Sequence, residues 1–175
     1  MFHTPLTVER FTPFAAGVLC CLSAACAAPV PPTATAAKVE QTQCSGVVQN
    51  DTALLQGTTV IRAEPIYTRV ENKTGSEEHV SGVKLVVRPT EGVSPERLAR
   101  TLQCHSARAL LGQVDRSQLP DDPYWLPDEW LDIKVTPENG NYAVSLQADS
   151  VSKNLQVYNR VSAYAGAHGV RTAMP

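Results

Sequence analysis

The chain has little net charge and no block of consecutive basic residues. Its 15 Lys and Arg side chains nearly balance 17 Asp and Glu side chains, which leaves a formal net charge of −2. Nucleic acids and anionic membranes both attract proteins that carry a clustered positive surface. The balance therefore predicts no nucleic-acid partner and no electrostatic attraction to a lipid surface.

Motifs of the common enzyme classes are also missing. The sequence contains no serine nucleophile elbow, P-loop, dinucleotide-binding glycine motif, zinc-protease helix or Cys-x-x-Cys pair. We therefore expect a protein that is not an enzyme and that needs no cofactor.

The sequence also lacks a long uninterrupted apolar run. The stretch from Phe14 to about Val30 is broken by Pro29 and is short for the ~20 residues of a membrane-spanning helix. Its apolar centre is followed by small residues, which is typical of a secretory signal. We predict a signal peptide over residues 1–25, with an uncleaved membrane anchor as the alternative.

The segment Leu22-Ser-Ala-Ala-Cys26 resembles the lipobox of bacterial lipoproteins. In that family the Cys is lipidated and becomes the new N-terminus. The resemblance implies a lipid such as palmitate on Cys26, a membrane partner through that lipid, and a place on the inner or outer membrane of the cell envelope, facing the periplasm or the exterior. The alternative is cleavage after Ala27 or Ala28, which would give a soluble secreted protein.

The residues after the lipobox are rich in Pro, Ala and Thr. Such segments act as extended spacers, so we predict a tether over residues 26–43. The rest is long enough for one hydrophobic core, and we predict a single domain over residues 44–166 followed by a disordered tail over 167–175.

The domain shows alternating strand patterns and two amphipathic helices. Strand patterns cover residues 58–70, 80–88, 131–136 and 142–147, and helical patterns cover 95–111 and a stretch from about 150, with a polar hairpin loop at 71–79. The order ββαββα predicts an α+β two-layer sandwich, in which an antiparallel sheet of about four strands carries two helices on one face.

Few cysteines remain once the signal is removed. Cys44 and Cys104 lie in the expected domain, and two cysteines in an exported protein are more often paired than free. Cys104 projects from the polar side of its helix, where a segment around Cys44 could cross and be bridged to it. The alternatives are a free thiol and a site for Cu(I) or Zn built from Cys104 and His105, with His79 or Cys44 as a further ligand.

Aromatic residues are scarce, and both tryptophans lie close together. Tyr124, Trp125 and Trp130 stand in a segment with four carboxylates, at residues 121–130. Aromatic faces could bind a glycan or a peptide, although aromatics also dominate burial within a core. Tyr124, Trp125 and Trp130 form the candidate ligand surface, and the carboxylates could instead bind Ca²⁺. The alternative is that the three aromatics fasten the Pro-rich loop to the core while the acids face water. We expect Trp130 to be buried and Trp125 to be more exposed.

These observations favour a non-enzymatic, lipid-anchored envelope protein with a small interaction or binding domain, whose partner is another envelope protein or a glycan. A periplasmic metal-binding or metal-stress protein that uses Cys104 and His105 is the alternative. A third class, an envelope hydrolase that uses the acids of residues 121–132, has the least support.

Overall fold

The computed structural model describes residues 29–47, 58–73, 75–115, 117, 121–168 and 171–172. The signal peptide and Cys26 lie outside these residues. The elements are α1 (Pro32–Gln43), β1 (Val60–Asn72), β2 (Gly75–Val87), α3 (Pro95–Leu110), β3 (Asp132–Glu138), β4 (Asn141–Gln147), α4 (Val151–Ala167) and β5 (Arg171–Thr172). The central six are in the predicted order ββαββα, and the α+β fold is confirmed.

Two antiparallel hairpins and the short parallel strand β5 make up the sheet, whose strand order is β3-β4-β2-β1-β5. β2 and β4 join the hairpins through five residue pairs, from Val83↔Leu146 to Val87↔Tyr142. The β3–β4 turn places Asn139 and Gly140 at φ 51° and 78°. Asn and Gly tolerate this left-handed backbone, which explains why the Asn-Gly pair marks the hairpin in the sequence.

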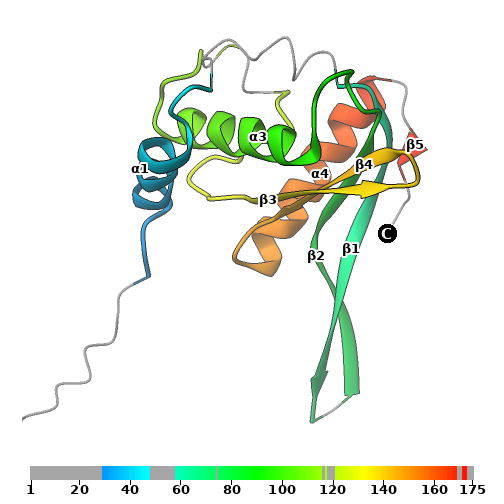
Figure 1. Cartoon of the computed structure of the whole chain (residues 1–175). Coiled ribbons are helices and arrows are strands. Elements are labelled where there is room, and N and C mark those ends of the chain that lie inside the picture. The colour runs from blue at the N-terminus through cyan, green and yellow to red at the C-terminus, as the bar shows by residue number, and fades with distance from the viewer. Residues whose placement is uncertain are drawn as a thin grey trace, which may run out of the picture.

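Helices α3 and α4 cover one face of the sheet, as Figure 1 shows. Alternate side chains of the strands meet the helices there, because successive side chains on a strand point to opposite faces. The core contains Ala63, Val83, Leu85, Ile133, Val144 and Leu146 from the sheet, Leu98 and Leu102 from α3, and Val157, Tyr158, Val161 and Ala165 from α4. The opposite face carries Arg62, Glu64, Lys84 and Glu138, which form an ion-pair network.

Both core helices begin at serine caps. Ser94 accepts a hydrogen bond from the Arg97 N–H at 3.2 Å, and Ser150 accepts one from the Lys153 N–H at 3.3 Å. A capping serine satisfies one of the backbone donors that a helix leaves open in its first turn. The caps fix where each helix begins relative to the preceding strand.

A third helix lies where we expected part of the tether. Residues 32–43 form α1, which packs against the outer side of α3, so the prediction of an extended spacer over residues 26–43 is wrong for this stretch. Pro32 occupies the first helical turn, where its missing N–H costs nothing, and the alanines that follow have high helix propensity. The Pro-rich composition therefore marks the beginning of a helix.

Two further expectations need correction. The polar segment 71–79 is mostly strand, because β1 runs to Asn72 and β2 begins at Gly75. The end of the chain is not wholly a disordered tail, since Ala167 belongs to α4 and β5 pairs in parallel with β1 at Arg62 and Ala63.

Candidate functional site

The aromatic segment is built more deeply into the fold than we expected. Tyr124 is only 3 % exposed and belongs to the core, so it drops out of the candidate ligand surface. Trp125 and Trp130 are both half-buried, and the expectation that Trp130 would be the buried one is wrong. The isolated pairing of Leu126 with Glu129 folds the segment into a tight turn between the two rings.

Arg160 of α4 holds the Trp125 end of this segment. Its guanidinium carbon lies 5.2 Å from the Trp125 ring centroid, and its Nε donates a hydrogen bond to the Asp122 carbonyl at 2.6 Å. Burial lowers the pKa of Arg160, while the nearby Asp122 and Asp121 carboxylates oppose that change. The cation therefore covers one face of the Trp125 ring, which is not open to a sugar or peptide.

His105 and Asp122 fasten the same segment to α3. The His105 Nε2 lies 2.5 Å from Asp122 Oδ2, and Asp122 Oδ1 accepts the Tyr124 N–H at 2.8 Å. Both side chains are largely buried, at 17 % and 9 % exposure. This pair resembles the base and orienting acid of a catalytic site, but within the described residues no hydrogen bond joins His105 to a serine or a thiol. Its observed role is to position the segment.

Cys104 is used by a disulfide. Cys44, just after α1, is bridged to Cys104 in the middle of α3, with Cα atoms 5.6 Å apart. Cys104 does project from α3 away from the sheet, and it is fully buried because α1 covers that side. A bridged sulfur is not a thiolate ligand, and the described residues contain no group of three or more His, Cys, Asp or Glu side chains placed to bind a metal ion.

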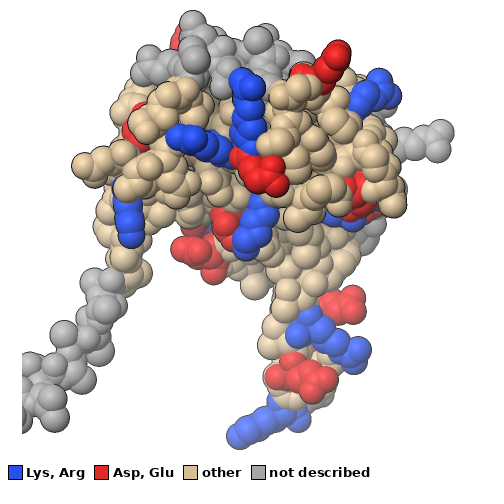
Figure 2. All heavy atoms as spheres, in the orientation of Figure 1, with Lys and Arg blue, Asp and Glu red and all other residues tan. Residues whose placement is uncertain are grey.

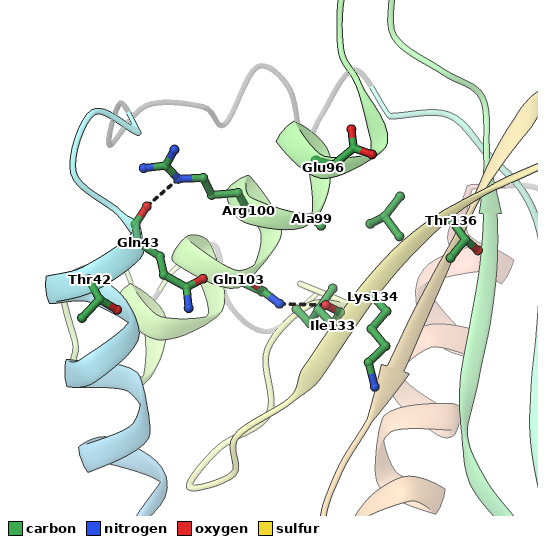
Figure 3. Close-up of a pocket in the computed structure, with 10 residues that line it drawn as sticks. Thr42, Gln43, Glu96, Ala99, Arg100, Gln103, Ile133, Lys134 and Thr136 are labelled. Carbon is green, nitrogen blue, oxygen red and sulfur yellow. Dashed lines mark hydrogen bonds between the residues drawn. The ribbon is translucent and has the colours of Figure 1, made fainter.

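An open groove of about 710 Å³ lies between the end of α1, α3 and strand β3 (Figure 3). Two of its polar side chains already serve the fold. Arg100 donates to the Gln43 carbonyl at 2.5 Å and to the Ser45 carbonyl at 2.9 Å, and Gln103 donates to the Ile133 carbonyl at 2.9 Å. These hydrogen bonds hold α1 and β3 against α3. Two further polar side chains of the groove also have partners within the domain, since Thr42 donates to the Lys38 carbonyl and Lys134 to Asp132.

A projecting arm is the feature that sequence reasoning missed. The outer ends of β1 and β2, residues 67–73 and 75–80, extend beyond the sheet as a two-stranded ribbon, and we call this part the arm (Figure 1). Neither β4 nor β5 accompanies it, because their pairings end at Val83 and Ala63. Every arm residue from 67–73 and 75–78 is exposed.

Side chains on the arm include apolar groups as well as charges. Tyr67 is 45 % exposed and Val70 is 46 % exposed. Charged side chains of both signs also lie along the projecting arm (Figure 2). Side-chain contacts within the arm include a hydrogen bond from Arg69 to the Ser76 hydroxyl and an approach of His79 Nε2 to Glu77 Oε2 at 3.4 Å. The high polarity of residues 71–79 concealed this strand, although the alternation from Thr68 to Glu71 continues the pattern of β1.

Comparisons with known proteins add no family to this description. Nothing matches the chain among protein-family models, curated proteins or solved structures. Within the part of the chain that the structure describes, no helix is long and apolar enough to cross a membrane.

Proposed function

We propose that the chain is a non-enzymatic, lipid-anchored protein of the bacterial cell envelope that binds a protein partner through the arm. The observation that carries the proposal is the arm itself, a ribbon of two strands in which Val80 at the base packs against the hydrophobic core and the rest projects beyond it. Among the described residues, no further strand pairs with either edge of the arm. An isolated two-stranded hairpin is only marginally stable in water, and three or more strands are needed for independent stability. A partner strand would supply the missing neighbour.

The chemistry of the arm favours a protein over a glycan. An open strand edge offers backbone donors and acceptors to another extended chain, which is the basis of recognition by strand addition. Tyr67 and Val70 add exposed apolar area, and tyrosine is enriched at protein interfaces. The aromatic surface that a glycan would need is reduced, since Tyr124 lies in the core and Arg160 stands over Trp125.

The lipid anchor on Cys26 is supported by the Leu22–Cys26 segment alone. If Cys26 carries lipid, the described helix α1 limits how far the domain can lie from the membrane. Only residues 27–31 separate Cys26 from α1, and six residue steps of extended chain reach about 20 Å. The domain would then be held close to the lipid surface, without a long tether.

The alternative of a metal-binding protein gains no support from the geometry, because Cys104 is bridged to Cys44 and His105 is paired with Asp122. The arm is therefore the binding element that we propose.

Site-specific photo-crosslinking in cells tests this proposal. A photoreactive residue at Tyr67, 45 % exposed, should form a covalent adduct with a protein. The matched control is the same residue at Leu155, which is 47 % exposed and belongs to α4, not to the arm. Replacing residues 69–78 by a two-residue Asn-Gly turn should abolish binding while the domain keeps its melting temperature. Equal labelling at both positions, or none at Tyr67, would contradict the proposal.

A further inference from the structure

The arm has two backbone edges, and the hairpin geometry determines which residues face each of them. Asn72 pairs with Gly75 across a two-residue connection, and residues that flank such a connection bond to each other through both N–H and C=O. Val70 and Thr68 therefore also bond to β2. The backbone groups of Tyr67, Arg69 and Glu71 point the other way, to the free edge of β1. Pro65 fits this alternation, because proline is tolerated where its missing N–H faces a free edge.

Other strand edges in the described part of the chain are protected against pairing. The same alternation places Pro137 on the outer edge of β3, where it removes a donor. On β2 the adjacent Glu77 and Glu78 protect the arm, since antiparallel pairing of this edge with its own copy brings carboxylates opposite or next to each other. The β1 edge between Tyr67 and Glu71 carries neither a proline nor two adjacent like charges.

This edge is complementary to itself in one register. Antiparallel pairing with a second copy must match residues that face the free edge, so the twofold axis can pass through Thr68, Arg69 or Val70. An axis at Arg69 sets that cation against its own copy. An axis at Thr68 places Pro65, which has no N–H, opposite Glu71. It also brings the tip of the second arm onto Ala63, which already pairs with β5.

An axis at Val70 avoids all three conflicts. It places Arg69 opposite Glu71 of the second copy, twice by symmetry, and Thr68 opposite Asn72. Val70 then faces its own copy in a pair without hydrogen bonds, where the Cα atoms of antiparallel strands are about 4.5 Å apart. Opposite charges and apolar contacts directly across strands both stabilise such pairs.

We propose that the partner of the arm is a second copy of this chain, paired edge to edge through β1 about Val70. The two arms then form a continuous four-stranded ribbon, β2-β1-β1-β2, which provides the neighbours that one hairpin lacks. The contact is short, so it depends on two chains being held near each other. A shared membrane surface does this by raising the effective concentration. This inference rests on the proposed function and names its partner.

Cysteine cross-linking in membranes from cells that carry the full chain tests the register. Val70→Cys should give a disulfide-linked dimer on mild oxidation, because the expected Cα separation lies in the range that a disulfide spans. The matched control is Glu77→Cys, directly opposite Val70 on β2 of the same arm and one strand further from the axis. We expect at least tenfold more dimer from Val70→Cys than from Glu77→Cys or from the unmodified chain. Equal yields, or no dimer, would overturn the inference.

A charge exchange provides an independent test. Arg69→Glu and Glu71→Arg should each reduce the Val70→Cys dimer at least fivefold, because like charges then face each other. The double variant restores opposite charges and should recover the yield. Arg69 and Glu71 are both exposed, so we expect these substitutions to leave the domain folded. If Tyr67 photo-crosslinks to a different protein while Val70→Cys gives no dimer, binding by the arm stands and self-pairing is refuted.

Discussion

Arg108 of α3 and Glu40 of α1 form a largely buried ion pair that holds the two helices together. The Arg108 Nε lies 3.1 and 3.2 Å from the two Glu40 carboxylate oxygens, and the guanidinium also donates to the Val47 carbonyl at 3.1 Å. Cys44–Cys104 bridges the same helices close by. Since Ala36 is the one fully buried residue of α1, the docking of this helix depends on polar and covalent links.

Removing Glu40 should therefore destabilise the domain. Glu40→Leu leaves the guanidinium, whose side chain is 9 % exposed, without its counter-ion, and breaking a buried pair costs about 3–5 kcal/mol. We expect about 3 kcal/mol in urea unfolding, because Glu40 itself is 26 % exposed. The control is Asp132→Ala, which breaks the exposed Lys134–Asp132 pair and should cost less than about 1 kcal/mol. Equal losses from the two variants would show that the buried pair does not hold α1.

Reduction of the disulfide should release α1 before the rest of the domain unfolds. The bridge spans a sequence separation of 60, for which loop-closure entropy predicts a stabilisation of about 4 kcal/mol. We expect Cys44→Ser/Cys104→Ser to unfold at lower urea, with amide exchange rising first in residues 32–43. Unchanged exchange in α1 would mean that the Arg108 contacts are sufficient.

Gly82 should not tolerate any side chain. A Cβ at this position would lie 2.6 Å from the Leu146 carbonyl oxygen and 2.8 Å from the Gln147 Cγ, where β2 meets the end of β4. We expect Gly82→Ala to lower stability by about 1–3 kcal/mol, as overpacking does. Gly166→Ala is the matched control, since it lies in α4 with nothing within 4 Å. It should stabilise by about 0.5–1 kcal/mol through helix propensity.

The sheet and its two helices could be predicted from the sequence because local signals agreed with the fold. Ser94 with Pro95 marked the beginning of α3, and Asn139–Gly140 marked the β3–β4 turn. Alternation located β3, β4 and the inner part of β2. The cap and the turn are set by neighbouring residues, and the alternation reflects one face of each strand packing on the core, so all three can be seen in the local sequence.

The arm and α1 could not be predicted in this way, because neither packs an apolar face on the core. Polar and charged side chains stand on both faces of most of the arm, so its sequence does not alternate between a core face and a solvent face. α1 buries little and is held by Arg108 and Cys104, which lie more than 60 residues further along the chain. The burial of Tyr124 could not be predicted either. Its segment is folded inward by the bonds of Asp122 to His105 and Arg160, which join parts of the chain that are distant in sequence.

Burial of Tyr124 should make the domain sensitive to alkali. Burial raises the pKa of Tyr124 well above its ordinary value, with smaller contributions from Tyr164 and Asp122. The unfolded chain therefore releases this proton first, near pH 10, and stability falls as pH rises beyond that value. We expect Tyr124→Phe to lose less stability than the unmodified protein between about pH 9.5 and 11. Parallel pH profiles in urea unfolding would contradict this role of Tyr124.

The anchor is tested by the mass of the mature protein. If Cys26 is lipidated, protein extracted from membranes should begin at Cys26 and carry additional acyl mass. Cys26→Ala should then leave the domain folded but remove the acyl mass, because the lipid is attached to that sulfur. Cys20→Ala and Cys21→Ala are matched controls, since both residues precede the expected cleavage site and should leave the mature mass unchanged. A mature N-terminus at Ala28 or Pro29 without acyl groups would refute the anchor. The arm could then still pair in solution, at the higher concentrations that untethered chains require.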